Sequence, residues 1–332
     1  MVPEQICDAD FQVYGSGKAL FTDALTQTRQ PRWQICQEGQ GAFFPLRKPG
    51  ILRSGCRIGT VGHFSFFSIE RNIEHKTAVL YLNRPDARNA MSWEFWHELP
   101  QAVAELEADN DIRCVIIAGR GKSFSTGLDI VDFFTRFKDI VTADSADGRE
   151  TLRRFILELQ AGLRAVADGN KIYIAAVHRH CIGGGLDLIS ACDLRLASAD
   201  AKVSLREAKV AIVADMGSLN RLPGIIGMGH TRMMALTGRD FNAAECQSMG
   251  LFNEVYPDQE ELMTAAHNLA AEIAANPALA VQGTKRVLNY IQDHGVNDSM
   301  DYVATFNAAF LDSLDFRELG QAFVEKRKPR FQ

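Results

Sequence analysis

The stretch HCIGGGLDLISACDLR, residues 180–195, contains three consecutive glycines followed by an apolar run. The preceding run KIYIAAVH, 171–178, predicts a buried strand, and the residues after the glycines predict a helix. Glycine loses more backbone freedom on folding than any other residue, so three together need a reason. The first N–H groups of a helix are unpaired, and glycine lets a ligand oxygen approach them closely. The stretch therefore predicts a strand, a glycine turn and a helix whose N-terminus binds an oxygen atom.

Two kinds of ligand oxygen fit such a turn, a phosphate or a carbonyl that gains negative charge. The phosphate-binding patterns GxxxxGK[ST] and GxGxxG do not match GGGLDL. The alternative is an oxyanion hole, in which N–H groups stabilise charge on a carbonyl oxygen. Such a hole usually needs a second donor, and FSTGLD, 124–129, supplies one because it follows the predicted strand 114–119.

Outside these stretches, strands and helices alternate along the chain. The pattern predicts a strand at 77–83, then a helix that Ser92 can cap and that Pro100 should kink or divide. Alternation of this kind indicates an α/β fold with a parallel sheet. Further elements are expected as strands at LRLAS and AKVSL and as helices over 150–168 and from about 258 onward.

Composition and charge narrow the class of protein. The chain has 332 residues and a formal net charge of −5, which favours neither nucleic acid nor an anionic membrane surface. The seven cysteines are scattered and form no CxxC, so we expect reduced thiols, no metal site and a cytoplasmic protein. Residues 1–65 show no sustained periodicity and are expected to be a poorly ordered N-terminal extension.

Five ordered blocks then resemble the enoyl-CoA hydratase/isomerase (crotonase) superfamily over about 66–332. The resemblance implies an α/β crotonase spiral of ββα units over 66–260 and a C-terminal helical trimerisation region over 261–332. It further implies an acyl-CoA thioester substrate, no separate cofactor because coenzyme A is part of the substrate, and a homotrimer or homohexamer. The blocks are NRPDARNAMS, GKSFSTGLDI, HRHCIGGGLDLISACDLRLAS, LREAKVAIVADMGSLNRLPGIIG and TGRDFNAAECQSMGLFNEVYP.

The resemblance also implies roles for individual residues. The backbone N–H groups of Leu128 and Gly184 would form the oxyanion hole. One departure from the family is STGLD, which replaces the commoner TAG or AAG pattern and places Thr126 beside the hole. The residues expected to flank the substrate and its coenzyme A are Arg88, Ala90, Gly127, Leu128, Asp129, Ile130 and Gly184.

Three acids follow the glycine turn, namely Asp187, Glu207 and Asp215. Hydratases of the family carry glutamates at the first two positions, whereas Asp, Glu and Asp at this spacing resemble the Δ3,5-Δ2,4-dienoyl-CoA isomerases of fatty-acid β-oxidation. That subgroup moves a proton from C2 to C6, a task that suits two carboxylates. We expect Glu207 and Asp215 to shuttle the proton, while Asp187 tunes their pKa values or takes one of the roles.

Two other functions stay open from the sequence. A 2-enoyl-CoA hydratase of the same fold would depend on Asp187 and Glu207 but would tolerate loss of Asp215. A trimeric RNA-binding or scaffold protein is the non-enzymatic alternative, although the acidic net charge and the lack of a basic stripe count against it.

Overall fold

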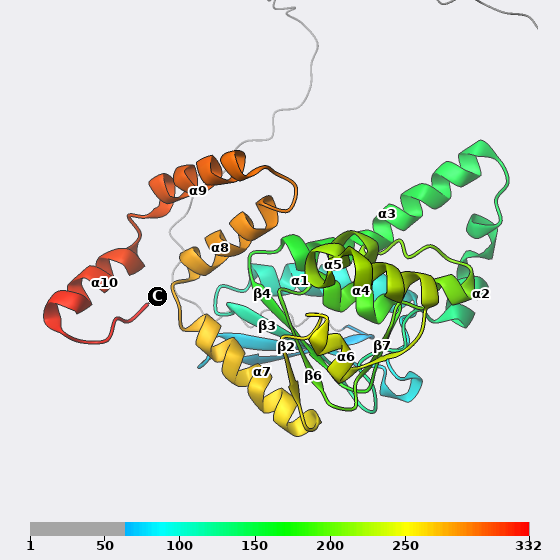
Figure 1. Cartoon of the computed structure of the whole chain (residues 1–332), viewed down its shortest axis with the longest axis horizontal. Helices are drawn as coiled ribbons and strands as arrows, with labels where there is room; N and C mark the ends of the chain where they lie inside the picture. The colour runs from blue at the N-terminus through cyan, green and yellow to red at the C-terminus, as the bar shows by residue number, and fades with distance from the viewer. Residues whose placement is uncertain (1–63, 332) are drawn as a thin grey trace, which may run out of the picture. The chain divides into compact units, whose positions relative to one another are not determined.

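A six-stranded sheet organises residues 64–331, which the computed structural model describes (Figure 1). Its strand order is β1-β2-β3-β4-β6-β9, and only the β1–β2 pair is antiparallel. The inner strands β3 and β4 are buried along their whole length, which explains their continuous apolar runs. The strands span Phe67–Asn72 (β1), Thr77–Leu82 (β2), Cys114–Gly119 (β3), Ile172–Val177 (β4), Leu194–Ser198 (β6) and Glu254–Tyr256 (β9).

A second, three-stranded sheet joins the loops that carry the predicted site. Its order is β5-β7-β8, formed by His180–Ile182, Lys202–Ser204 and Phe241–Asn242. Strand β5 immediately precedes the glycine turn, and its Cys181 forms an isolated bridge with Ser125. This small sheet therefore places the two glycine loops next to each other.

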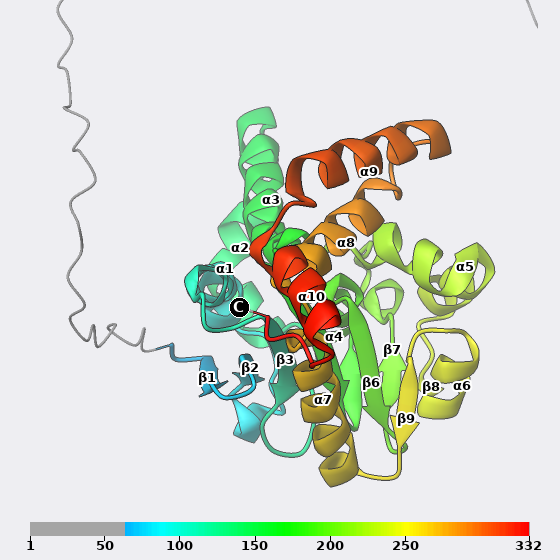
Figure 2. The same ribbon diagram turned by 90° about the vertical axis from the view of Figure 1, so that its left-hand side faces the viewer.

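Helices cover both faces of the large sheet (Figure 2). Alternate residues of a strand point to opposite faces, so Val115 of β3 packs in the core with α1 and α3, while Ile116 packs against α7. The helices are α1 (Trp93–Ala108), α2 (Ile130–Val141), α3 (Ala146–Asp168), α4 (Gly184–Ala191), α5 (Ser218–Thr237), α6 (Ala243–Ser248), α7 (Gln259–Ala274), α8 (Ala278–Tyr290), α9 (Val296–Phe310) and α10 (Leu314–Glu325), with 3-10 turns η1 (Pro85–Ala87) and η2 (Glu207–Val210).

The first helix departs from the sequence prediction in two details. Ser92 occupies the N-cap position of α1, but its hydroxyl bonds to Glu94 instead of capping the backbone. The carboxylate of Asp132, on α2, accepts the N–H of Trp93 instead. Pro100 was expected to kink or divide the helix, and of these two effects division does not occur, since α1 is one helix. Packing of its apolar face against the core outweighs the lost hydrogen bond.

Two domain boundaries were expected from the sequence, at 65/66 and at 260/261. Of the expected extension, 1–65, only residues 64 and 65 are described. The expected boundary at 260/261 falls in the first turn of α7, which packs on the sheet through Leu262 and Ala266. Among the described helices, none is both long enough and apolar enough to cross a bilayer.

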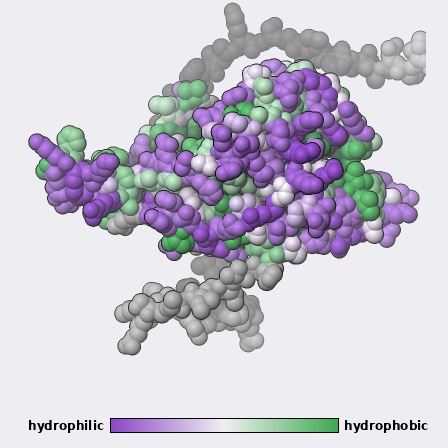
Figure 3. Space-filling view, turned by 90° about the horizontal axis from the view of Figure 1, so that it is seen from below, coloured by the Kyte–Doolittle hydropathy of each residue, from purple (hydrophilic) through white to green (hydrophobic). Residues whose placement is uncertain are grey.

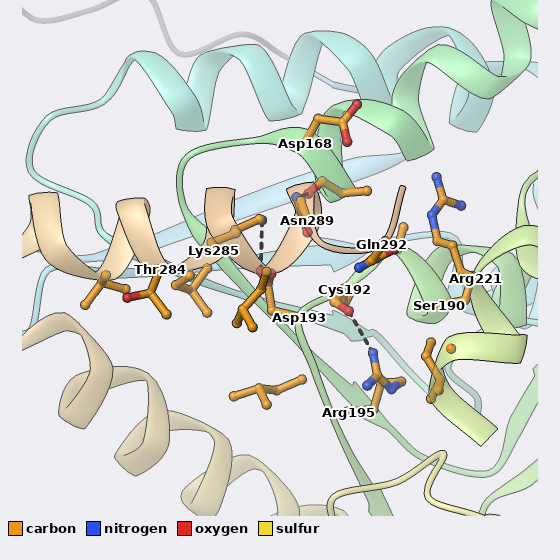
Figure 4. Close-up of a pocket in the computed structure, with 18 of the residues that line it drawn as sticks. Asp168, Ser190, Cys192, Asp193, Arg195, Arg221, Thr284, Lys285, Asn289 and Gln292 are labelled. Carbon is orange, nitrogen blue, oxygen red and sulfur yellow. Dashed lines mark hydrogen bonds and ion pairs between the residues drawn. The ribbon is translucent and has the colours of Figure 1, made fainter. Parts of the chain in front are cut away.

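The helices after α7 carry many exposed apolar side chains. In the space-filling view, apolar patches interrupt a mainly hydrophilic surface (Figure 3). Helix α8 is tied to the core because the buried ammonium of Lys285 donates to the Asp193 carboxylate at 2.9 Å (Figure 4). The most exposed apolar side chains of α9 and α10 are Val296, Met300, Leu314, Phe323 and Val324.

Candidate active site

The two glycine loops contact each other at Gly127 and the turn that precedes α4. A Cβ atom on Gly127, whose φ is +83°, would lie 2.6 Å from the Ile182 carbonyl oxygen and 3.4 Å from the Gly184 nitrogen. A Cβ atom on Gly184 would lie 2.7 Å from the Met91 sulfur. Gly127 therefore requires glycine, as expected for a close approach of two backbones, whereas a side chain at Gly184 would have to displace the Met91 side chain.

The peptide groups of these loops leave two N–H groups without partners. The Gly127 carbonyl accepts the Met91 N–H at 2.8 Å, so the N–H of Leu128, in the same trans peptide, points the opposite way. The Gly183 carbonyl likewise accepts from α4, so the Gly184 N–H points out of the helix N-terminus. Within the described chain, neither N–H donates a hydrogen bond. The structure thus brings the two predicted donors to adjacent positions.

The three predicted acids come from three different segments. Asp187 lies in the first turn of α4 and is only 2% exposed. Glu207 begins the 3-10 turn η2, and its Oε1 lies 3.0 Å from where a Cβ atom on Gly183 would be. Its Oε2 is buried and has no hydrogen-bond partner. Asp215 lies in the loop before α5.

Burial shifts all three carboxyl groups toward the protonated form, and repulsion from neighbouring carboxylates adds to the shift of Asp187 and Glu207. Burial raises the pKa of Asp187 to about 6, against the hydrogen bond from the Ser218 N–H, and Asp215 adds to the rise. Burial also raises the pKa of Glu207 to about 7, and the charges of Asp187 and Asp215 raise it further. Burial raises the pKa of Asp215 as well. A cluster of this kind can hold a proton near neutral pH and pass it on, as acid–base catalysis requires.

The residues predicted to flank coenzyme A lie around the loop after β2. Arg88 is exposed, with a left-handed backbone, and Ile130 is exposed at the start of α2. Both backbone polar groups of Ala90 already have internal partners, the Ala87 carbonyl and the Arg84 guanidinium. Asp129 accepts from Arg84 at 2.7 Å, which lowers the pKa of the aspartate and links the two substrate loops.

Several residues that contact this site were not predicted from the sequence. The Ser218 N–H donates to Asp187, and the Gln160 side chain of α3 donates to the Asp215 carbonyl. Trp96, whose indole nitrogen is buried without a partner, lies beside the Gly184 position. Only the contacts between distant segments distinguish these residues, so no local signal in the sequence marks them.

A cavity of about 660 Å³ lies between α8 and the segment from α4 to β6 (Figure 4). Lys285 and Asp193 form an ion pair on its wall, and the Arg195 guanidinium donates to the Cys192 carbonyl. Arg221 of α5 lies at its end. The residues that line this cavity include none of the three predicted acids, so it is separate from the candidate active site.

Curated relatives share most of the chain. A protein of Dictyostelium discoideum, named Delta(3,5)-Delta(2,4)-dienoyl-CoA isomerase, mitochondrial, is 40% identical over 81% of this chain and 92% of its own. A peroxisomal protein of the same name from Arabidopsis thaliana is 41% identical over 79% of this chain and 95% of its own. Among solved structures, a candidate enoyl-CoA hydratase from Streptomyces coelicolor superposes with a TM-score of 0.74, at 28% identity, over 84% of this chain and 98% of that one.

These relatives correct one expectation drawn from composition. The prediction of a cytoplasmic protein is wrong, because the relatives are named as mitochondrial or peroxisomal proteins. The prediction rested on cysteines that form no disulfide pattern. Reduced thiols exclude only oxidising compartments such as the secretory route, so they cannot distinguish the cytosol from these organelles.

A family model agrees with the fold and with the glycine loops. The model of the enoyl-CoA hydratase/isomerase family matches residues 72–332, which include both loops, all three acids and the C-terminal helices. The solved structure above has the crotonase fold, which confirms the predicted fold class. The chain therefore belongs to the enoyl-CoA hydratase/isomerase family.

Proposed function

We propose that the protein isomerises 3,5-dienoyl-CoA to 2,4-dienoyl-CoA. The observation that carries this proposal is the meeting of Asp187, Glu207 and Asp215 beside the glycine turn, from segments that the chain separates by 20 and 8 residues. Relatives that share 40% and 41% identity with the chain are named for this reaction. The hydratase alternative has weaker support, since a relative from Thermus thermophilus with a hydratase name is 35% identical.

The thioester carbonyl would bind at the two free N–H groups. Removal of a proton next to this carbonyl gives a dienolate whose charge is delocalised onto the oxygen. The N–H groups of Leu128 and Gly184 would stabilise that charge, helped by the positive end of the α4 dipole. This oxyanion hole accounts for the glycines, because side chains at Gly127 or Gly184 would collide with neighbouring atoms.

The proton transfer would use the carboxyl groups that surround the hole. One carboxylate removes a proton from C2, the double bonds shift from C3–C4 and C5–C6 to C2–C3 and C4–C5, and a carboxylic acid protonates C6. We assign the shuttle to Glu207 and Asp215, with Asp187 beside them. The unpartnered Oε2 of Glu207 supports the assignment, because a buried oxygen without a partner is free to exchange a proton with substrate. No step in this route needs a metal or a separate cofactor.

The substrate class follows from the family. A coenzyme A thioester with an unsaturated acyl chain would enter between the loop after β2 and the loop before α2, which the Arg84–Asp129 ion pair holds together. Aromatic side chains beside Leu128, among them Trp93 and Phe133, give this region an apolar wall suited to a fatty acyl chain. The reaction would serve fatty-acid β-oxidation, which degrades such chains.

We also infer that the C-terminal helices form the interface of a homotrimer or homohexamer. Phe323 and Val324 at the end of α10 are 85% and 81% exposed, and water-exposed apolar side chains in such numbers mark a protein interface. Phe323→Glu is expected to reduce the mass measured by light scattering from three or six chains toward a single chain of 36.8 kDa. Gln321→Glu, on the same helix, is the control. A monomeric parent protein would contradict the inference.

The activity is tested in two parallel assays with the full chain. Added 3,5-dienoyl-CoA should give the ultraviolet absorbance of a conjugated 2,4-dienoyl thioester, while 2-enoyl-CoA should be hydrated little or not at all. Hydration without isomerisation would favour the hydratase. Inactivity in both assays would overturn the proposal, and binding of RNA at physiological salt would then favour the non-enzymatic alternative.

A further inference from the structure

Helix α5 begins directly against the carboxylate of Asp187. The N–H of Ser218, the first residue of α5, donates to Oδ1 of Asp187 at 2.9 Å, and both residues are buried. The two residues are 31 positions apart, so the bond joins the start of α5 to the first turn of α4. Within the described chain, no hydrogen bond reaches Oδ2 of Asp187.

The local sequence explains why this bond forms. The N-cap of α5 is Gly217, which has no side chain and provides no cap, and its φ is +108°. The Ser218 N–H would otherwise be one of the unpaired donors of a helix start. The Asp187 carboxylate takes the place of the missing cap. Arg221, one turn further along α5, adds a positive charge that favours the ionised aspartate.

We propose that Ser218 is a positioning residue that fixes Oδ1 of Asp187 and keeps this carboxylate ionised, so that Glu207 holds the exchangeable proton. Only the role of this proton in catalysis rests on the proposed function. The contact between Ser218 and Asp187 is present in the protein without substrate. An ionised Asp187 in turn favours the protonated form of Glu207, because two negative charges this close repel each other.

The groups around Asp187 have opposing effects on its pKa. Its burial and the charge of Asp215 favour protonation, whereas Ser218 and Arg221 favour ionisation. The balance leaves the pKa of Asp187 at about 6 and that of Glu207 at about 7. The groups that face Asp187 are Cys181 of β5, Glu207 of η2, Asp215 of the loop before α5, and Arg221 of α5.

The decisive variant removes the donor and keeps the helix. Proline lacks an N–H and is accepted at the first position of a helix, so Ser218→Pro deletes the bond to Asp187. Ser218→Ala keeps the N–H. Ala146→Pro is the matched control, because Ala146 is the exposed first residue of α3 and its N–H contacts no carboxylate.

The readout is the infrared band of protonated carboxyl groups, followed against pH and assigned with Asp187→Asn and Glu207→Gln. In Ser218→Pro the midpoint of Asp187 should rise by about one pH unit, a tenfold change in its ionisation constant, and that of Glu207 should fall. Ser218→Ala should shift the midpoints less, because the Ser218 hydroxyl is buried without a hydrogen-bond partner in the described chain and only the N–H bonds to Asp187. Ala146→Pro should not shift them. Unchanged midpoints in a folded Ser218→Pro protein would overturn the proposal.

A measurement on the parent protein covers the case in which Ser218→Pro does not fold. The amide proton of Ser218, observed in protein labelled with ¹⁵N-serine and assigned as the signal that Ser218→Ala removes, should change its NMR chemical shift with the ionisation of Asp187. An amide signal that does not titrate would overturn the proposal. Neither readout requires turnover, so an inactive protein with the expected titration would contradict the proposed function alone. In an active protein, Ser218→Pro should narrow the pH profile of kcat/KM. Its acid limb should move to higher pH with the pKa of Asp187, and its basic limb should move to lower pH with the pKa of Glu207.

Discussion

Glu207→Gln is expected to lower the turnover of 3,5-dienoyl-CoA by about 10³-fold, the middle of the range for loss of a general acid or base. Glutamine keeps the size of the side chain but can neither accept nor deliver a proton. The buried Oε2 of Glu207 has no other partner, so its loss should affect chemistry more than packing. The measurement is kcat, followed through the absorbance of the conjugated product.

Stability provides a check that Glu207→Gln still folds. The folded-state pKa of Glu207, about 7, lies above the ordinary value of 4.5, so folding favours its protonated form. The associated stabilisation is present below pH 4.5 and is lost as the pH rises through 7; the cost of the buried charge reaches about 3 kcal/mol at higher pH. Glutamine avoids that cost, so at pH 8 the variant should unfold at no lower temperature than its parent.

Two further variants separate the isomerase from the hydratase. Asp215→Asn should reduce isomerisation strongly if this aspartate shares the shuttle, whereas a hydratase that relies on Asp187 and Glu207 would tolerate it. Glu254→Gln, an exposed glutamate at the start of β9, is the control and should leave kcat unchanged. Full activity of Glu207→Gln would rule out the proposed role of this residue.

Gly127→Ala is expected to lower kcat by at least about 10²-fold, the effect of losing one oxyanion donor. The new Cβ atom would lie 2.6 Å from the Ile182 carbonyl and 3.4 Å from the Gly184 nitrogen, and alanine strongly disfavours a φ of +83°. The loop must therefore move, which displaces the N–H of Leu128 from its position beside Gly184. The assay is the same absorbance measurement, combined with thermal unfolding.

Gly229→Ala is the matched control for this substitution. A Cβ atom on Gly229, within α5, would meet no atom within 4 Å, so alanine should stabilise the helix slightly and leave kcat unchanged. If Gly127→Ala retained the parent's kcat, the N–H of Leu128 could not be an essential donor.

Local patterns predicted much of the fold. The buried runs CVIIAG and IYIAAV are strands β3 and β4, and the helix over 150–168 is α3, which begins slightly earlier, at Ala146. Continuous apolar runs mark strands buried on both faces, and this signal lies within a few consecutive residues. The sequence could not show that α1 continues through Pro100, because the effect of a proline on its helix depends on packing against the core.

In the candidate site, too, some features could be predicted from short stretches of sequence and others could not. By itself, the sequence determined the strand, the glycine turn, the helix and the order of the three acids. Glycines that permit a close backbone approach, and the motifs of the family, can both be recognised within a few consecutive residues. Only the tertiary structure decided that Gly127 meets Gly184, that Gln160 bonds the Asp215 loop, and that Ser218 binds Asp187. These contacts join segments 31 or more residues apart, and such contacts depend on how strands and helices pack rather than on the preferences of any short segment.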